Sequence, residues 1–229
     1  MPARNVEKYI DEAIRSVLEQ RSAAFELLIA DDASTDETWS RIQAYKNDPR
    51  VRLWRFRKQR GVGAVGNYLM ARAKKSHIAF CDADDKMLPG LLWVLKQTLE
   101  RNPKAGVAFT DRLVNDASGR LHPLLRSRGP TETWDLVDGT ISNGGAIVRR
   151  ALIKKVGGFR LDLPYLEDCE LFWRLSEVTR FVYIKGKPLY FYRRRPGSLT
   201  EKFKKRENAI RAKILREIIK RRYGLRVRW

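Results

Sequence analysis

Apolar and polar residues alternate in blocks that predict helices and strands in turn along the first half of the chain. Residues 6–18 carry apolar side chains at the i, i+3, i+4 spacing of one helical face. Residues 25–30 form a short apolar run typical of a buried strand, and residues 51–56 alternate as a strand does. The same criteria predict further helices at about 39–45, 67–75 and 89–101, and further strands at 77–81 and 106–110.

This order of elements predicts an α/β fold: a mostly parallel sheet flanked by helices on both faces. Such a sheet normally begins with a strand, whereas residues 1–5 resemble the turn that follows one. We therefore expect the first strand to be missing from this chain, which would leave its two neighbours without a shared partner. Unpaired backbone groups in a sheet interior are costly.

The pattern weakens in the second half of the chain. Residues 111–139 hold Pro123, Gly129 and Pro130 among scattered polar residues, which indicates a loop or a substrate-facing insertion. Beyond it we expect a strand at 141–148, a helix at 166–177, two strands at 181–184 and 188–192, and a basic amphipathic helix from 198 to 223. The predicted organisation is one domain over 1–200, divided near residue 110, and a basic C-terminal helix over 201–229.

Composition changes this outline mainly through charge. The 229 residues are 43% apolar, enough for a sizeable core, and carry a net charge of +20. Residues 201–229 alone hold twelve Lys or Arg against three Glu. An excess of positive charge gives information about binding partners and not about the fold. The candidate partners are an anionic membrane, nucleic acid and an anionic substrate. The chain has no apolar run of about 20 residues and no signal peptide, which favours a cytoplasmic location.

Cysteine and histidine offer little chemistry here. Cys81 and Cys169 are too few for a disulfide framework and lack metal-ligand spacing, so we expect both to be reduced. His77 and His122 are isolated in the sequence, which argues against a histidine metal site.

Three acidic clusters stand out in this basic chain: Asp31-Asp32, Asp82-Ala83-Asp84-Asp85 and Glu167-Asp168. The first two directly follow predicted strands, where open α/β sheets build their ligand sites. Crowded carboxylates are costly unless a cation or a polar ligand compensates them. These clusters are therefore the candidate functional residues.

Each cluster allows a functional and a structural interpretation. Asp82, Asp84 and Asp85 could present carboxylates to Mg²⁺ or Mn²⁺, or could form a solvated loop that caps the next helix. Asp32 could accept hydrogen bonds from a base or ribose, or could serve an N-cap and turn. Glu167 suits the start of a helix because of the helix dipole, whereas Asp168 could be a general base.

Taken together, these segments resemble family 2 of the glycosyltransferases, an inverting family with the Rossmann-like GT-A fold. The resemblance covers about residues 2–200 and rests on seven segments in order: Pro2–Asn5 with Ser16–Gln20, Phe25–Asp36, Arg60–Ala64, Ile78–Asp85 with Pro89, Gly157–Phe159, Glu167–Leu175, and Pro188–Arg193 with Gly197-Ser198. Each segment alone is a weak signal, but their order and spacing are highly specific.

The resemblance implies a role for particular residues. Asp32 would bind the nucleotide base, with Pro2 and Ala3 in the loop beside it. Asp84 and Asp85 would hold the metal and the donor diphosphate, with Asp82 adjacent. Asp168 would be the catalytic base. Arg193 and Ser198 lie where the family often closes over the diphosphate, which is a weaker transfer.

The same resemblance implies cofactor and partners. The cofactor would be Mn²⁺ or Mg²⁺, the donor a nucleotide-sugar with UDP-sugars favoured, and the acceptor a glycan or lipid-linked molecule of cell-envelope polysaccharide synthesis. The sequence departs from the family pattern at the missing first strand, at Gly66, where many relatives carry Arg, and in the unusually basic run Arg193-Arg194-Arg195.

Two other functions fit parts of the sequence. The missing strand and the basic tail are compatible with a catalytically weak domain that binds a membrane or a partner protein. A nucleic-acid binder would use the positive charge, but no nucleic-acid motif is present and the acidic clusters would repel phosphate. The basic helix could lie on the inner face of the plasma membrane, against anionic lipid, or could be an ordinary solvated face.

Overall fold

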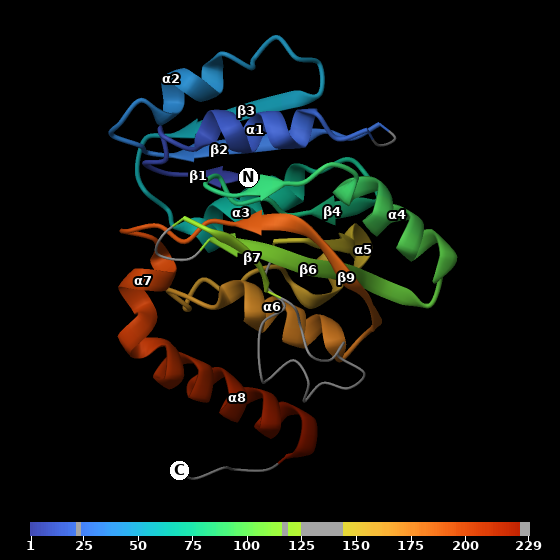
Figure 1. The fold of residues 1–229 in the computed structure, drawn as a ribbon. Coiled ribbons are helices and arrows are strands. Elements are labelled where there is room, and N and C mark those ends of the chain that lie inside the picture. The colour runs from blue at the N-terminus through green and yellow to red at the C-terminus, as the bar shows by residue number, and fades with distance from the viewer. Residues whose placement is uncertain (22–23, 116–118, 125–143, 225–229) are drawn as a thin grey trace.

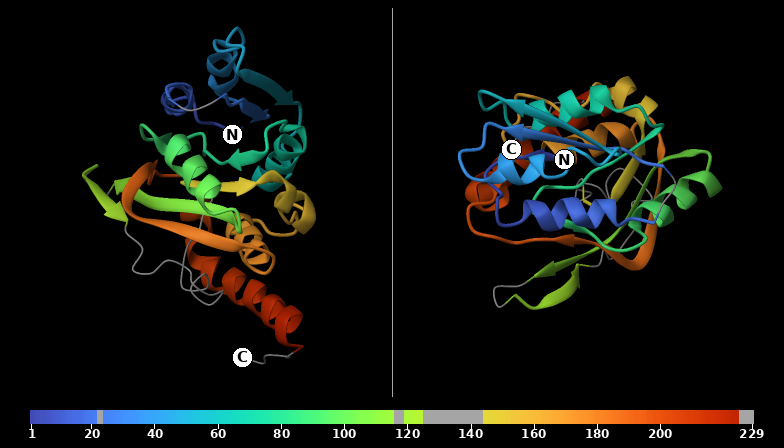
Figure 2. Two further views of the ribbon diagram at one scale, coloured as in Figure 1. Left: turned by 90° about the vertical axis from the view of Figure 1, so that its right-hand side faces the viewer. Right: turned by 90° about the horizontal axis from the view of Figure 1, so that it is seen from above.

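The computed structural model describes residues 1–21, 24–115, 119–124 and 144–224, and it confirms the α/β class. Two sheets are stacked along the molecule with helices packed around them (Figure 1). The smaller sheet, built from the N-terminal residues, lies at the opposite end of the molecule from the C-terminal helix α8 (Glu207–Tyr223) (Figures 1 and 2).

The first sheet contains three parallel strands in the order β1-β2-β3. Each strand is followed by a helix that returns the chain to the same end of the sheet, which is why the strands run parallel. Its elements are β1 (Pro2–Ala3), α1 (Ile10–Leu18), β2 (Leu27–Asp32), α2 (Thr38–Gln43), β3 (Val51–Phe56) and α3 (Val62–Arg72).

The second sheet is mixed and corrects the expectation of a mostly parallel one. Its order is β4-β8-β6-β9-β5 with β7 beside β6; among the strand pairs of the described residues, β6–β9 is parallel and the others are antiparallel. Parallel pairing therefore holds in the first sheet and in one pair of the second. The elements are β4 (His77–Ala79), β5 (Lys86–Met87), α4 (Leu91–Arg101), β6 (Ala105–Asn115), β7 (Leu121–Leu124), β8 (Ala146–Arg149), α5 (Arg150–Val156), α6 (Glu167–Ser176) and β9 (Arg180–Tyr192).

The region predicted as a loop, 111–139, is partly sheet. β6 continues to Asn115 and pairs with β7, while residues 116–118 and 125–143 lie outside the described part of the chain. The two strands expected at 181–184 and 188–192 form one long strand, β9, that passes through Gly186 at φ +72°. Both halves of β9 pair with β6.

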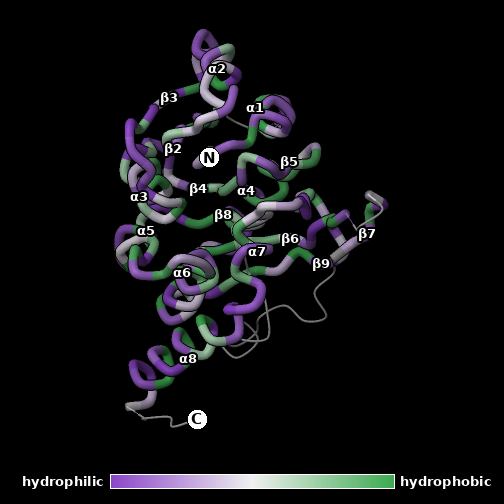
Figure 3. Tube along the Cα trace, turned by 90° about the vertical axis from the view of Figure 1, so that its left-hand side faces the viewer, coloured by the Kyte–Doolittle hydropathy of each residue, from purple (hydrophilic) through white to green (hydrophobic). Residues whose placement is uncertain are grey.

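The described part of the basic C-terminal segment is divided into α7 (Leu199–Phe203), the 3₁₀ turn η2 (Lys204–Arg206) and the 17-residue helix α8, where the sequence predicted one helix. α8 buries Ile214 and Ile218 in the cluster that contains Trp173 of α6. Its other positions are largely hydrophilic (Figure 3). Within the described ranges, no helix is both long and apolar enough to cross a membrane.

The two sheets are separated by a cavity. In the part of the chain that the structure describes, no ladder joins β2 to β4, and a cavity of about 330 Å³ lies between them with apolar lining residues such as Leu28, Leu69 and Ile78. The Met1 amine donates a hydrogen bond to the Leu28 carbonyl at 2.9 Å, and the Ala30 amide donates to the Met1 carbonyl at 3.1 Å. The sequence predicted only a turn at residues 1–5, but Pro2–Ala3 forms the short strand β1 and pairs with β2.

The Met1 amine itself is fully buried at the edge of this cavity. Burial lowers its pKa to about 6, and the nearby Cys81 and Asp82 oppose that shift only in part. The environment of the N-terminus therefore disfavours its charged form, and the charge of Asp82 is close enough to affect it.

Candidate active site

The turn Asp82-Ala83-Asp84-Asp85 lies between β4 and β5 and crowds three carboxyl groups. Asp85 is 1% exposed and accepts hydrogen bonds from the Tyr190 hydroxyl at 2.8 Å and the Arg193 backbone amide at 2.8 Å. Burial, followed by repulsion from Asp82 and Asp84, raises the pKa of Asp85 well above its usual range. The turn is thus held in place although its charges repel one another.

The turn also lies close to the start of α6, so the second and third acidic clusters meet. Burial, then Asp84, then Asp168 raise the pKa of Asp82 to about 7. Burial, then Asp168 and more weakly Asp82 raise the pKa of Glu167 to about 8. Two segments more than 80 residues apart therefore share one electrostatic environment. Glu167 is mostly protonated near pH 7, which lowers the negative charge beside Asp168.

Two arginine side chains contact Asp84. Arg195 Nε lies 2.6 Å from Asp84 Oδ2, and both side chains are less than a fifth exposed. Arg193 Nε donates to the Asp84 backbone carbonyl at 2.8 Å. The predicted donor-binding residue Arg193 thus lies against the predicted metal-binding turn.

Tyr190, which the sequence did not single out, organises this turn. Its buried hydroxyl donates to Asp85 and accepts the Asp82 amide at 3.1 Å. The ring lies against Gly144, where an added Cβ would meet it at 2.3 Å. Residue 144 must therefore be glycine for Tyr190 to occupy this position.

Asp168 lies in the first turn of α6. Its Oδ1 accepts the Cys169 backbone amide at 2.7 Å, and the helix begins after Leu166, which has a φ of +63°. A positive φ at a leucine costs roughly 1 kcal/mol or more, so the surrounding packing must enforce this entry angle.

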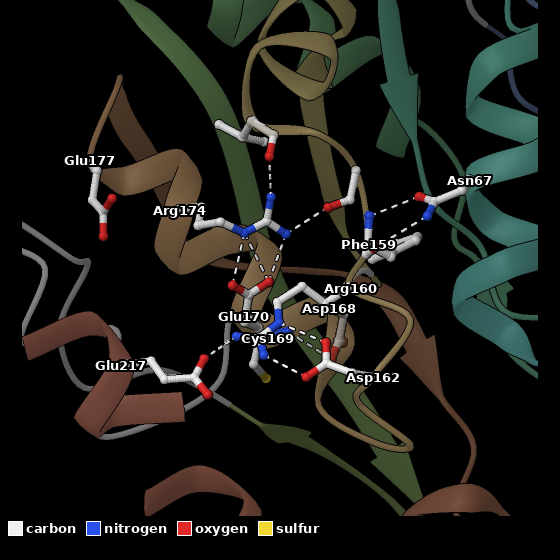
Figure 4. A network of polar contacts seen from close by, with 12 residues as sticks. Asn67, Phe159, Arg160, Asp162, Asp168, Cys169, Glu170, Arg174, Glu177 and Glu217 are labelled. Carbon is white, nitrogen blue, oxygen red and sulfur yellow. Dashed lines mark hydrogen bonds and ion pairs between the residues drawn. The ribbon is translucent and has the colours of Figure 1, made fainter. Parts of the chain in front are cut away.

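Arg174 of α6 connects this helix to the segment at the end of α5 (Figure 4). It forms an ion pair with Glu170 at 2.6 Å and donates to the carbonyls of Val156 and Gly158. Because Glu170 is 1% exposed, this pair is a buried and fully bonded connection. It fixes the helix that carries Asp168 to the turn that follows α5.

The turn that follows α5 is also hydrogen-bonded to α3. Asn67 donates to the Phe159 carbonyl at 2.8 Å and accepts the Phe159 amide at 2.7 Å (Figure 4). The Phe159 ring covers Gly66, where an added Cβ would meet it at 2.6 Å. This packing explains why residue 66 is glycine, without an arginine of the kind that many relatives carry.

The first acidic cluster is satisfied in a different way. Asp32 accepts the backbone amides of Arg60 and Gly61 at 2.7 and 2.9 Å, so it holds the loop that leads into α3. Asp31 is fully buried; its Oδ2 lies 3.4 Å from Arg55 Nε, and its Oδ1 has no hydrogen-bond partner among the described residues. Pro2 and Ala3 lie alongside Ala30 and Asp31 in the sheet.

Ser198 caps α7, because its hydroxyl accepts the Glu201 amide at 3.2 Å. This structural role accounts for the residue locally. Its predicted contact with the donor diphosphate stays a prediction, as do the nucleotide contacts of Pro2, Ala3 and Asp32.

The described residues contain no group of three or more His, Cys, Asp or Glu placed to hold a metal on its own. Asp84 and Asp85 nevertheless fit a Mg²⁺ or Mn²⁺ site of the kind that takes one or two carboxylates and completes its shell with substrate phosphates and water. The donor set thus suits a cation that binds together with a diphosphate.

Comparison with known proteins adds independent findings. The sequence model described as "Glycosyl transferase family 2" matches residues 1–157. An uncharacterized protein of Mycobacterium tuberculosis, MT1568, is 31% identical over 193 residues, covering 76% of this chain and 60% of that protein. Chondroitin synthase of Escherichia coli is 26% identical over 185 residues, covering 80% of this chain and 27% of the enzyme. The chain therefore spans less than two thirds of these relatives.

The fold is also found in a solved structure. The crystal structure of Staphylococcus aureus TarS residues 1–349 in complex with UDP-GlcNAc superposes with a TM-score of 0.76 at 21% identity, covering 98% of this chain and 72% of that one. The solved structure shows the shared fold, and the sequence matches show one family.

Proposed function

The chain belongs to glycosyltransferase family 2, and from this premise we propose that it moves a sugar from a nucleotide-sugar donor to a glycan or lipid-linked acceptor, with inversion at the anomeric carbon. A divalent cation, Mn²⁺ or Mg²⁺, would assist the reaction. A UDP-sugar is the donor class we favour, since the TarS structure that shares this fold contains UDP-GlcNAc.

One observation carries the proposal: the Asp82–Asp85 turn and the first turn of α6 face the same space, so that the Asp168 carboxylate raises the pKa of Asp82. A transferase needs a group that accepts the acceptor proton and a separate group that handles the leaving diphosphate. Asp168 and the pair Asp84 and Asp85 are available for these two tasks from two different elements.

In the proposed reaction, an acceptor hydroxyl oxygen attacks the anomeric carbon from the face opposite the diphosphate. The new carbon–oxygen bond forms as the bond from the anomeric carbon to the phosphate oxygen breaks. The hydroxyl proton passes to the Asp168 carboxylate, and the electron pair of the broken bond leaves with the nucleoside diphosphate. Burial raises the pKa of Glu167 to about 8, which weakens its negative charge next to the proposed base.

Charge develops on the diphosphate as it leaves. A bound divalent cation would neutralise part of that charge. Asp84 and Asp85 would hold such a cation, while Arg193 lies beside them for direct contact with the phosphates. Asp32, which already holds the Arg60-Gly61 loop, has lone pairs left for a base or ribose donor.

Donor hydrolysis measures this site without knowledge of the acceptor. We expect slow release of UDP from a UDP-sugar in the presence of Mn²⁺, and a fall of about 100-fold or more in Asp168→Asn and in Asp85→Ala. Asp48→Asn is the matched control, because Asp48 forms only a local pair with Arg50. Unchanged hydrolysis in both site variants would contradict the assignment.

A basic surface on the C-terminal pieces favours a second, compatible role in membrane contact. Lys202, Lys204, Lys205, Arg206 and Lys220 are exposed. Anionic lipid attracts such residues by about 1 kcal/mol each. Co-sedimentation with anionic and neutral liposomes tests this, using Lys204→Gln/Lys205→Gln as the variant. Equal binding to both liposome types would argue for a plain solvated surface.

A further inference from the structure

The ion pair between Arg195 and Asp84 joins two distant segments at the candidate diphosphate site. Arg195 comes from the segment after β9 and reaches back 111 residues to the Asp82–Asp85 turn. Its Nε lies 2.6 Å from Asp84 Oδ2, in a setting where both side chains are largely screened from water. The Arg195 guanidinium is therefore paired with the Asp84 carboxylate, which the proposed function assigns to a divalent cation.

Arg193, two residues earlier, is held in a different manner. Its backbone amide bonds to Asp85, its Nε to the Asp84 carbonyl, and its terminal nitrogen to Glu12. The guanidinium also lies over the Phe191 ring at 4.9 Å. With four separate contacts, Arg193 is a fixed part of the site.

Arg195 is held to the turn by fewer contacts. Besides Asp84, the Arg195 guanidinium contacts the Tyr9 ring at 5.4 Å and the carbonyl of the next residue, Pro196, at 3.5 Å. The chain then turns at Gly197, which has a φ of +74°. The side chain can therefore leave Asp84 without breaking a network.

The balance of charge favours such a movement. Asp82, Asp84 and Asp85 lie within one short turn, and Arg195 brings only a single positive charge to them. A divalent cation would bring two and would prefer carboxylate oxygens. A guanidinium set free at this position would stand beside bound phosphates, which it can bind through two parallel hydrogen bonds.

We propose that Arg195 is a positioning residue that holds Asp84 in the donor-free enzyme, releases it to a divalent cation, and then binds the nucleoside diphosphate of the donor. This inference rests on the proposed function, because it concerns the same donor site. It makes metal binding and diphosphate binding mutually dependent through one side chain.

The first test measures Mn²⁺ binding to the free enzyme by electron paramagnetic resonance. Removing the competing cation in Arg195→Gln is expected to tighten Mn²⁺ binding on the order of tenfold. Arg194→Gln removes the same charge from the exposed neighbour, whose backbone groups bond to Asn115, and is expected to bind Mn²⁺ as the wild type does. Arg195→Lys keeps the charge, and its Mn²⁺ affinity should lie between those of the wild type and Arg195→Gln.

A purely structural role gives a different result. If Arg195 only fixes the loop, Arg195→Gln lowers the melting temperature and leaves Mn²⁺ binding unchanged or weaker, and the proposal is then wrong. Tighter Mn²⁺ binding together with a loss of thermal stability still supports it, since the two readouts are independent.

The second test measures UDP binding by calorimetry with saturating Mn²⁺. Arg195→Gln is expected to weaken UDP binding on the order of tenfold, and Arg194→Gln to leave it unchanged. Equal UDP affinity in all three proteins would overturn the transfer of Arg195 to the diphosphate. A wild type that binds neither Mn²⁺ nor UDP overturns both this inference and the proposed function. A wild type that transfers sugar while Arg195→Gln changes neither affinity overturns this inference alone.

Discussion

The acidic clusters at the ends of β2 and β4 use the same residue type in opposite ways. At Asp32 the carboxylate accepts two backbone amides and thereby builds a loop of the first half. At Asp82, Asp84 and Asp85 the carboxyl groups repel one another, and burial raises the pKa values of Asp82 and Asp85. Asp32 is satisfied within the protein, although Oδ1 of its neighbour Asp31 has no hydrogen-bond partner among the described residues, whereas the carboxyl groups of the second cluster repel one another.

This difference separates Asp32, which stabilises a loop even without a ligand, from carboxyl groups whose mutual repulsion the fold does not relieve. Removing a satisfied carboxylate leaves its donors without partners, which costs stability. Removing a crowded one relieves repulsion and costs function instead. Substitutions in the two clusters should therefore show opposite balances of stability and activity.

The largest effect is expected for Asp84→Asn. Loss of the charge at the proposed cation and diphosphate position should lower UDP-sugar turnover by at least about 100-fold. Its free energy of unfolding should fall by no more than about 2 kcal/mol, because relief of the repulsion between Asp84 and Asp85 offsets part of the cost of breaking the largely buried ion pair with Arg195. Turnover and urea unfolding on the same samples check this, and a larger fall in stability would erase the contrast.

Asp32→Ala should mainly lower the stability of the protein. The amides of Arg60 and Gly61 lose their acceptor, which should cost about 1–3 kcal/mol. Asp32→Asn retains one acceptor oxygen and should lose about half as much. Chemical denaturation gives both values; an Asp32→Ala protein as stable as wild type would show that water replaces the carboxylate.

The buried Met1 amine offers a test by pH alone. Its folded pKa of about 6 lies below the ordinary 8.0, so the unfolded chain binds more protons between these values. Stability should therefore rise by about 2 kcal/mol from pH 6 to pH 8 and be lost as the pH falls back to 6. Urea unfolding across this range measures it, with Met1 verified by mass spectrometry. An N-acetylated sample should lack the dependence.

The smallest effect is expected at Asp82, with the opposite sign. Its folded pKa of about 7 lies above the usual 3.8, so its contribution is present below pH 4 and lost as the pH rises to 7. Asp82→Asn should therefore be about 1–2 kcal/mol more stable than wild type at pH 8, with no difference near pH 4. A destabilised Asp82→Asn protein at pH 8 would show that the crowding is compensated.

The first half of the fold could be predicted from the sequence because its signals are local. Apolar periodicity located α1, β2 and β3 to within a few residues, and the acidic residues at strand ends were visible directly. The second sheet could not be predicted in the same way. β9 resembled two strands around Gly186, and its pairing with β6 depends on contacts distant in sequence.

The same limit applies to the site. Asp84, Asp85 and Asp168 were predicted from their position in motifs, and the structure brings the turn and α6 together. Tyr190 and Arg195 were missed as site residues, since each bonds to an aspartate more than 100 residues away. No local pattern carries such a pairing. A glycine that a tyrosine ring requires, as at residue 144, becomes apparent only in three dimensions.

The cavity between β2 and β4 has a consequence for the response of the protein to pressure. Unfolding eliminates internal voids, so a protein with such a space loses volume when it opens. The close-packed cluster around Trp173 and Leu171 has little volume to give up. Hydrostatic pressure should therefore separate the two sheets first, while α6 and its anchored turn remain folded.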